Sequence, residues 1–128
     1  MDLYREEVME HYEHPRNQGE LVGDDVLSDR DSNASCGDMI QFFIKIGNNQ
    51  DPKSNKQIIT EVKWKGIGCA ITTASASKLS EYLQGRTLKE LRGMSEEELL
   101  KNGVGFEVNQ GRIKCLMLSV KVVKKLFI

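Results

Sequence analysis

The sequence predicts an α+β domain in which a small, three-stranded antiparallel sheet packs against helices in two layers. Three observations predict this fold. Apolar and polar residues alternate, as is typical of strands, within residues 22–65, and segments with helical spacing follow them. The composition, 39% hydrophobic and 29% charged, is that of a soluble globular chain. A length of 128 residues without a repeat or linker predicts a single domain, residues 1–128.

An N-terminal helix is expected first. Tyr4, Val8 and Tyr12 recur at helical spacing. The helix should end before Pro15, because the residue that precedes a proline is pushed out of the helical region. The residues from Pro15 to Gly19 are then expected to form a turn.

Three strands are expected next. A weak strand covers Val22–Leu27, and a polar loop, Ser28–Ser35, follows it because Asp, Ser and Asn favour loops. Two further strands form an antiparallel hairpin across the polar connection 47–57, and Gly66 and Gly68 interrupt the second of them. The apolar pattern is Ile40, Phe42, Ile44 and Ile46 in the first strand, and Ile58, Thr60, Val62 and Trp64 on one side of the second.

Helices account for the rest of the chain. Residues 69–83 contain no Gly or Pro and predict a helix that ends near Gly85. We expect Gly103 and Gly105 to break the helical pattern, and a C-terminal helix to cover residues 112–127. Two pairs with capping-box spacing predict the starts of two short helices between them: Thr87 with Glu90, and Ser95 with Glu98.

The charge is balanced, with a formal net charge of -1. Binding to nucleic acid or to an anionic membrane needs clustered excess Lys and Arg, so neither is an expected partner. No apolar run approaches the roughly 20 residues that span a bilayer. Acidic residues follow Met1 instead of a basic start and an apolar signal core, and we expect a cytoplasmic protein.

The three cysteines are the main candidates for chemistry. Cys36 ends the polar loop, Cys69 lies at a strand-to-helix junction, and Cys115 begins a helix. The positive end of a helix dipole stabilises a thiolate, and Lys114 should add to that effect at Cys115. An odd number of cysteines in a reducing compartment favours metal binding or reactive thiols over disulfides.

A carboxylate next to the first cysteine supplies a fourth candidate ligand. Gly37 lets the chain turn tightly enough for Cys36 and Asp38 to reach one ion. Three thiolates and one carboxylate can complete a tetrahedral zinc site, and thiolates also suit iron-sulfur clusters. Unrelated core cysteines and a solvated Asp38 are the alternative, which spacing leaves open because the chain has no C-x-x-C motif.

A nucleophilic cysteine paired with histidine is a different class of function. The sequence gives it little support, because both histidines lie in the N-terminal segment and no Cys-His protease motif or Walker-type phosphate loop is present. We expect His11 and His14 to be surface or packing residues and not ligands.

Four segments carry a resemblance to a known family. They are HYEHPRNQG (His11–Gly19), NASCGD (Asn33–Asp38), GIGCAITTASAS (Gly66–Ser77) and RIKCLML (Arg112–Leu118). In this order, along nearly the whole chain, they resemble the IscU/NifU-type iron-sulfur cluster scaffolds, including the SufU branch. The resemblance implies the α+β fold, and it implies that Cys36, Asp38, Cys69 and Cys115 are the ligands of a metal ion or cluster.

Departures from the family pattern place the chain between its branches. Lys114 stands where many IscU proteins have histidine, and the sequence ASAS (Ala74–Ser77) is also similar to SufU. The chaperone-recognition sequence LPPVK of bacterial IscU is replaced by NQGRIK, so a dedicated Hsp70-type partner is not expected. The long insertion typical of SufU between the second and third cysteines is also missing.

The resemblance implies a scaffold or carrier protein, not an enzyme. It would accept persulfide sulfur from a cysteine desulfurase, assemble a labile 2Fe-2S cluster with iron, and pass the cluster to acceptor proteins. Cys115 and Cys36 are the candidate persulfide acceptors, and a homodimer is an open expectation for the cluster-bound form. The alternatives are a SufU-like, zinc-dependent sulfur-transfer protein that stimulates a desulfurase, and a structural zinc domain that mediates interactions.

Overall fold

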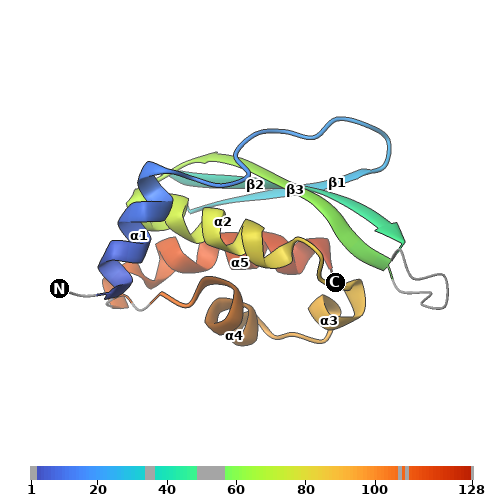
Figure 1. Ribbon diagram of the computed structural model, residues 1–128. Coiled ribbons are helices and arrows are strands. Elements are labelled where there is room, and N and C mark those ends of the chain that lie inside the picture. Colours follow the sequence, from blue (N-terminus) through green and yellow to red (C-terminus); the bar gives the residue numbers. More distant parts are fainter. Residues whose placement is uncertain (1–2, 34–36, 49–56, 107, 109, 128) are drawn as a thin grey trace.

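The computed structural model describes residues 3–33, 37–48, 57–106, 108 and 110–127. It confirms the predicted α+β fold: a three-stranded antiparallel sheet in the order β1-β2-β3 is covered on one face by helices α2 and α5 (Figure 1). The elements in chain order are α1 (Leu3–Glu13), β1 (Val26–Asn33), β2 (Asp38–Asn48), β3 (Gln57–Ile67), α2 (Ala70–Leu83), α3 (Leu88–Arg92), α4 (Glu96–Leu99), the π-helical turn η1 (Leu100–Val104), the 3-10 turn η2 (Gln110–Arg112) and α5 (Ile113–Leu126).

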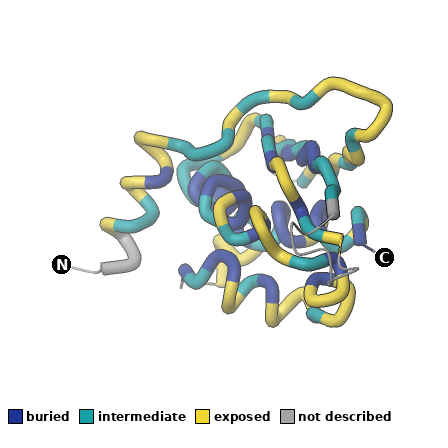
Figure 2. Tube along the Cα trace, turned by 45° about the vertical axis from the view of Figure 1, so that its right-hand side comes forward, coloured by how far each residue is buried: buried dark blue, intermediate teal, exposed yellow. Residues whose placement is uncertain are grey.

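The core lies between the sheet and the two long helices. Phe42, Ile44, Val62 and Trp64 point into it from the β2–β3 hairpin and are almost completely buried. Buried residues follow α2 along its length, whereas the connection before β1 is mostly exposed (Figure 2). The hydrophobic pattern of the hairpin therefore predicted correctly which strands carry the core.

A β-bulge changes which side chains of β3 face that core. Lys45 pairs with Glu61 but the next residue, Ile46, pairs with Ile59, so Thr60 is the extra residue. Its hydroxyl donates to the carbonyl of Lys45 at 3.2 Å. The prediction that Ile58 and Thr60 lie on the same side as Val62 and Trp64 is therefore wrong: Ile59 is buried with these two residues, because the bulge shifts the alternation by one residue.

The first strand lies later in the chain than predicted. The expected strand Val22–Leu27 and the expected loop Ser28–Ser35 are both corrected by β1, which covers Val26–Asn33. Polar residues suit this strand because it is at the edge of the sheet. The backbone N–H groups of Arg30 and Ser32 donate to the carboxylates that directly precede them, and Lys125 of α5 donates to the carbonyl of Arg30 at 2.7 Å.

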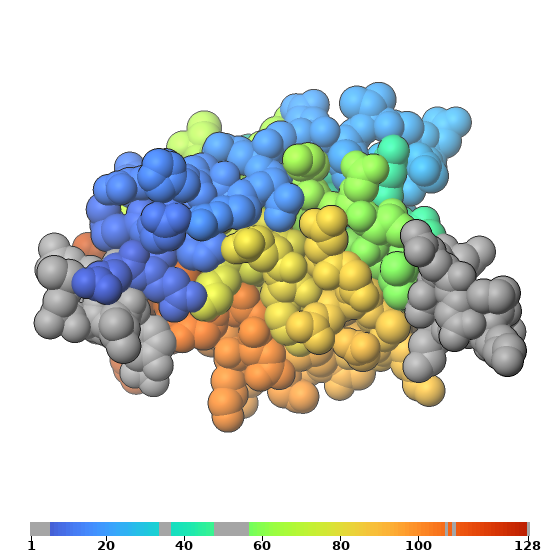
Figure 3. Space-filling model, viewed as in Figure 1, coloured from blue at the N-terminus to red at the C-terminus, as the bar shows by residue number. Residues whose placement is uncertain are grey.

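Hydrogen bonds to backbone carbonyl groups connect the N-terminal segment to β3. The α1 helix ends at Glu13, before Pro15 as predicted. The indole of Trp64 donates to the carbonyl of Arg16 at 2.7 Å, and its backbone N–H donates to the carbonyl of Asn17 at 2.9 Å. Figure 3 shows this segment at the surface of the molecule, beside atoms of β3 and α2. The residues of the first family-like segment therefore anchor the N-terminus.

Capping predictions hold for the short helices. Thr87 accepts a hydrogen bond from the N–H of Glu90, and Ser95 forms a complete capping box. The expected break at Gly103 is wrong, because η1 continues through it. Gly103 is needed for close packing, since a Cβ there would lie 2.7 Å from the side chain of Leu79. The turn ends at Gly105, which has a φ of 74°.

A second glycine prediction also needs correction, and it bears on the site. Gly66 does not interrupt β3, which continues to Ile67. It pairs with Ile40, and a Cβ at residue 66 would lie 2.2 Å from the carbonyl oxygen of Met39. The glycine therefore allows β3 to lie close against the start of β2. This contact holds the beginning of β2 beside the beginning of α2.

Gly66→Ala is expected to lower the free energy of unfolding by about 1–3 kcal/mol, because the added methyl group must push the two strands apart. Urea denaturation of the metal-free protein measures this change. Gly93→Ala is the control, since residue 93 has a φ of -83° and the nearest atom to an added Cβ is 3.5 Å away. Equal stability of Gly66→Ala and the wild type would contradict the close contact.

Candidate metal centre

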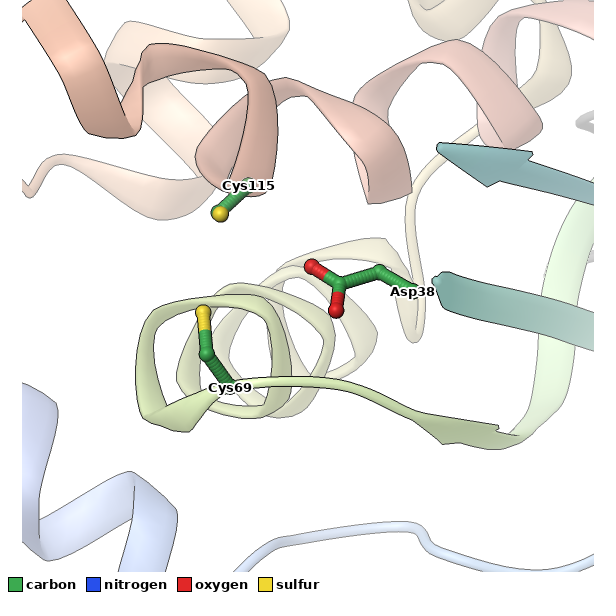
Figure 4. A group of neighbouring side chains, drawn as sticks. All are labelled: Asp38, Cys69 and Cys115. Atoms are coloured by element: carbon green, nitrogen blue, oxygen red, sulfur yellow. The ribbon is translucent and has the colours of Figure 1, made fainter. Parts of the chain in front are cut away.

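Three predicted ligands meet at one end of the sheet. Asp38 begins β2, Cys69 is the N-cap residue of α2, and Cys115 lies in the first turn of α5. A carboxylate oxygen and the two sulfur atoms lie within 4.8 Å of one another, although the residues are far apart in the sequence. Figure 4 shows the three side chains pointing into a common space. This spacing suits a single metal ion or a small cluster.

The fourth predicted ligand, Cys36, lies outside the described residues. It stays a prediction. Its neighbour Gly37 has a φ of 74°, a conformation that L side chains rarely adopt, and this agrees with the predicted tight turn before Asp38.

The three side chains line an open cavity of about 540 Å³. Its rim is exposed and includes Ile67, Gly68 and Arg112. Lys114 does not line this cavity: it is exposed and borders a neighbouring hollow between β1 and α5. Arg112 opens the third family-like segment but was not predicted as a site residue. Among the described residues that line the cavity, it is the one with a cationic side chain.

Thr72 connects two of the ligands and was also missed. Its hydroxyl donates to Oδ2 of Asp38 at 2.7 Å and lies 3.5 Å from Sγ of Cys69. Asp38 is only 5% exposed and Thr72 is fully buried. The spacing of three residues between Cys69 and Thr72 at a helix start was the available signal, because it places both side chains on the same turn.

The two thiols have opposite pKa shifts. Burial raises the pKa of Cys69, but hydrogen bonds with the side chain and backbone of Thr72, with Cys115 and with the backbone of Ile71 outweigh it, and the pKa falls below its ordinary value. Burial, together with the hydrogen bond and charge of Cys69, raises the pKa of Cys115 to about 11. In the metal-free protein the first proton therefore leaves Cys69.

This result corrects one expectation. The helix N-terminus and Lys114 were expected to stabilise the thiolate of Cys115. Instead, burial and the neighbouring Cys69 dominate at Cys115, and the side chain of Lys114 is exposed to solvent. The order in which the two thiols ionise depends on their mutual proximity, which the separation of the cysteines in the sequence does not reveal.

The donor set fits a metal ion or cluster. Asp38 is a buried carboxylate, and within the described part of the chain no Lys or Arg forms a salt bridge with it. A buried charge without a counterion is costly, and a cation held with the two sulfur atoms would compensate it. Mixed sulfur and oxygen donors suit zinc and iron.

Neither histidine belongs to the site formed by Asp38, Cys69 and Cys115. Nδ1 of His11 is 2.7 Å from the hydroxyl of Ser77, and its ring packs edge-on against Phe106. Burial, followed by the charge of Arg16, lowers the pKa of His11. His14 is exposed. His11 is thus a packing residue and His14 a surface residue, as predicted, and neither of the two cysteines that the structure describes, Cys69 and Cys115, forms a pair with a histidine.

Among the helices that the structure describes, none has the length and apolar character needed to cross a membrane.

Two known proteins match the sequence over nearly its full length. The chain is 31% identical to the zinc-dependent sulfurtransferase SufU of Bacillus subtilis, over 96% of this chain and 88% of that protein. It is 30% identical to the iron-sulfur cluster assembly scaffold protein IscU of Haemophilus influenzae, over 94% and 90%.

A solved structure has the same fold. The N-terminal part of a nitrogen-fixing NifU-like protein from Brucella abortus superposes with a TM-score of 0.69 at 18% identity, and the match covers 97% of this chain and 91% of that one. The model of the NifU-like N terminal domain matches residues 3–126. The chain therefore belongs to the family of NifU-like N-terminal domains.

Proposed function

We propose that this protein is an iron-sulfur cluster assembly scaffold. It accepts sulfur from a cysteine desulfurase, assembles a labile 2Fe-2S cluster with iron, and passes the cluster to acceptor proteins. The observation that carries the proposal is the meeting of Asp38, Cys69 and Cys115 in one open cavity. The relatives named IscU, at about 30% identity, support the same role.

The proposed ligands of the cluster are Cys36, Asp38, Cys69 and Cys115. Thiolates are soft ligands that hold iron-sulfur clusters, whereas a carboxylate oxygen is a harder and weaker partner in such a site. Asp38 therefore supplies the weak position from which a cluster leaves. The exposed rim of the cavity gives an acceptor protein access to that position.

Sulfur enters by thiol exchange. A thiolate of the chain attacks the outer sulfur of the desulfurase persulfide, the S–S bond of that persulfide breaks, and the desulfurase thiolate leaves. Cys115 and Cys36 are the proposed first acceptors. Cys69 is the thiol that ionises first in the metal-free protein, and it therefore competes with them for the transferred sulfur.

A zinc-dependent sulfur-transfer protein is the second candidate. SufU of Bacillus subtilis carries that name, and Lys114 matches the SufU branch. Zinc would be held by the same four residues, and it would keep their thiols deprotonated and in place. A structural zinc domain is a weaker candidate, because the exposed rim leaves the site accessible to solvent and partners.

Two assays separate the leading candidates. Zinc-loaded protein is added to a cysteine desulfurase, and metal-free protein is reconstituted with ferrous iron and inorganic sulfide under anaerobic conditions. Cluster formation without stimulation of the desulfurase by the zinc form supports the scaffold. Stimulation without cluster formation supports zinc-dependent transfer. A homodimer of the cluster-bound form, and a cytoplasmic location, stay part of the proposal.

Asp38→Ala should lengthen the lifetime of a reconstituted cluster several-fold, because it removes the weak ligand. Decay of the visible absorption in the presence of a chelator measures the lifetime. Asp24→Ala, at an exposed position outside the site, is the control. An unchanged or shortened lifetime for Asp38→Ala would contradict the role of Asp38, provided that its thermal unfolding matches the wild type.

The opposite pKa shifts predict that iodoacetamide labels Cys69 at a lower pH than Cys115 in the metal-free protein. A lowered pKa means that the thiolate of Cys69 is present at a pH where Cys115 is still protonated. Peptide mass spectrometry on a Cys36→Ser background follows both thiols, and urea-unfolded protein is the reference. Labelling of Cys115 first, or of both thiols together, would exclude this order.

A further inference from the structure

The hydroxyl group of Thr72 is shared between two ligands of the candidate metal centre. It donates to Oδ2 of Asp38 at 2.7 Å, and it lies 3.5 Å from Sγ of Cys69. Thr72 belongs to the first turn of α2, whereas Asp38 begins β2. A single hydroxyl thus joins the helix that carries one sulfur ligand to the strand that carries the carboxylate.

Close packing fixes the direction of that hydroxyl. A Cβ at residue 68 would lie 2.8 Å from Cγ2 of Thr72 and 3.2 Å from Cγ of Asp38. The methyl group of Thr72 therefore occupies space that only a glycine at residue 68 leaves free. With the methyl group held there and the residue fully buried, the hydroxyl has little freedom to turn away from Asp38.

This hydrogen bond involves one of the two carboxylate oxygens of Asp38. Oδ2 of Asp38 accepts a hydrogen bond from Thr72, and Oδ1 takes no part in that bond. We infer that Thr72 is a positioning residue that holds Asp38 as a one-oxygen ligand beside Cys69 and Cys115. The inference rests on the proposed function, because it assumes that these residues bind a metal ion or cluster.

Hydrogen-bond partners of this kind contribute strongly to metal sites. A carboxylate that loses its partner can rotate or bind through both oxygens, and removal of such a partner typically lowers metal affinity by about 10–100-fold. The burial of Asp38 adds to the effect, because water has little access to replace the missing donor.

The test compares Thr72→Val, which keeps the shape but removes the hydroxyl, with Thr72→Ser, which keeps the hydroxyl. Metal-free protein is titrated with Co²⁺ under anaerobic conditions against a competing chelator, and the absorption spectrum reports thiolate ligation and coordination geometry. We expect Thr72→Val to bind Co²⁺ about 10–100-fold more weakly with an altered spectrum. We expect Thr72→Ser to bind within a few-fold of the wild type.

Thr73→Val is the matched control, since residue 73 follows on the same helix and does not line the cavity. Thermal unfolding of the metal-free variants shows that each is folded, and Thr72→Ala serves as a second variant without a hydroxyl. Wild-type affinity and spectrum in both hydroxyl-free variants would overturn the inference. A wild-type protein that shows no thiolate ligation of Co²⁺ would instead overturn the proposed function, and the inference with it.

Discussion

The backbone of β3 lies directly against the start of β2 at Gly66, with no room for a side chain between them. Two residues later, Gly68 leaves room for the side chain of Thr72, in the first turn of α2, to pack beside Asp38. These two contacts bring the start of one strand beside the start of one helix. The packing of α5 across the sheet then places Cys115 at the same end, and the candidate metal centre depends on all three placements.

The centre is asymmetric in its chemistry. Cys69 sits at a helix start among hydrogen-bond donors, which favour its thiolate, whereas Cys115 is held as a thiol by burial and by its neighbour. Asp38 is a buried carboxylate that accepts a hydrogen bond from Thr72. Such a set can bind a metal or cluster without holding it as firmly as four thiolates would. A protein that assembles and then releases its cargo needs this balance, and so does one that exchanges sulfur.

The sequence alone predicted the fold class and most helices, because hydrophobic spacing and capping pairs are local signals. The predictions were wrong where contacts between residues far apart in the sequence determine the local structure. The polar segment β1 is a strand because Lys125 of α5 and the carboxylates of Asp29 and Asp31 form hydrogen bonds with its backbone at the edge of the sheet. The bulge at Thr60 turns Ile59, in place of Ile58, toward the core. Asp38, Cys69 and Cys115 were predicted through motifs. The contact of Thr72 with Asp38 and the position of Arg112 at the rim of the cavity depend on the folded arrangement of β2, α2 and α5, which the motifs do not describe.

The central claim is that Asp38, Cys69 and Cys115 bind one metal ion or cluster. Metal and sulfide analysis of anaerobically purified protein, together with its visible absorption spectrum, tests it most directly. We expect bound iron with sulfide and a visible absorption, both lost in Cys69→Ser and in Cys115→Ser. Bound zinc in place of iron and sulfide would agree with a metal site at these residues and would favour the sulfur-transfer function. Protein without metal, or metal retained unchanged in both variants, would contradict the claim.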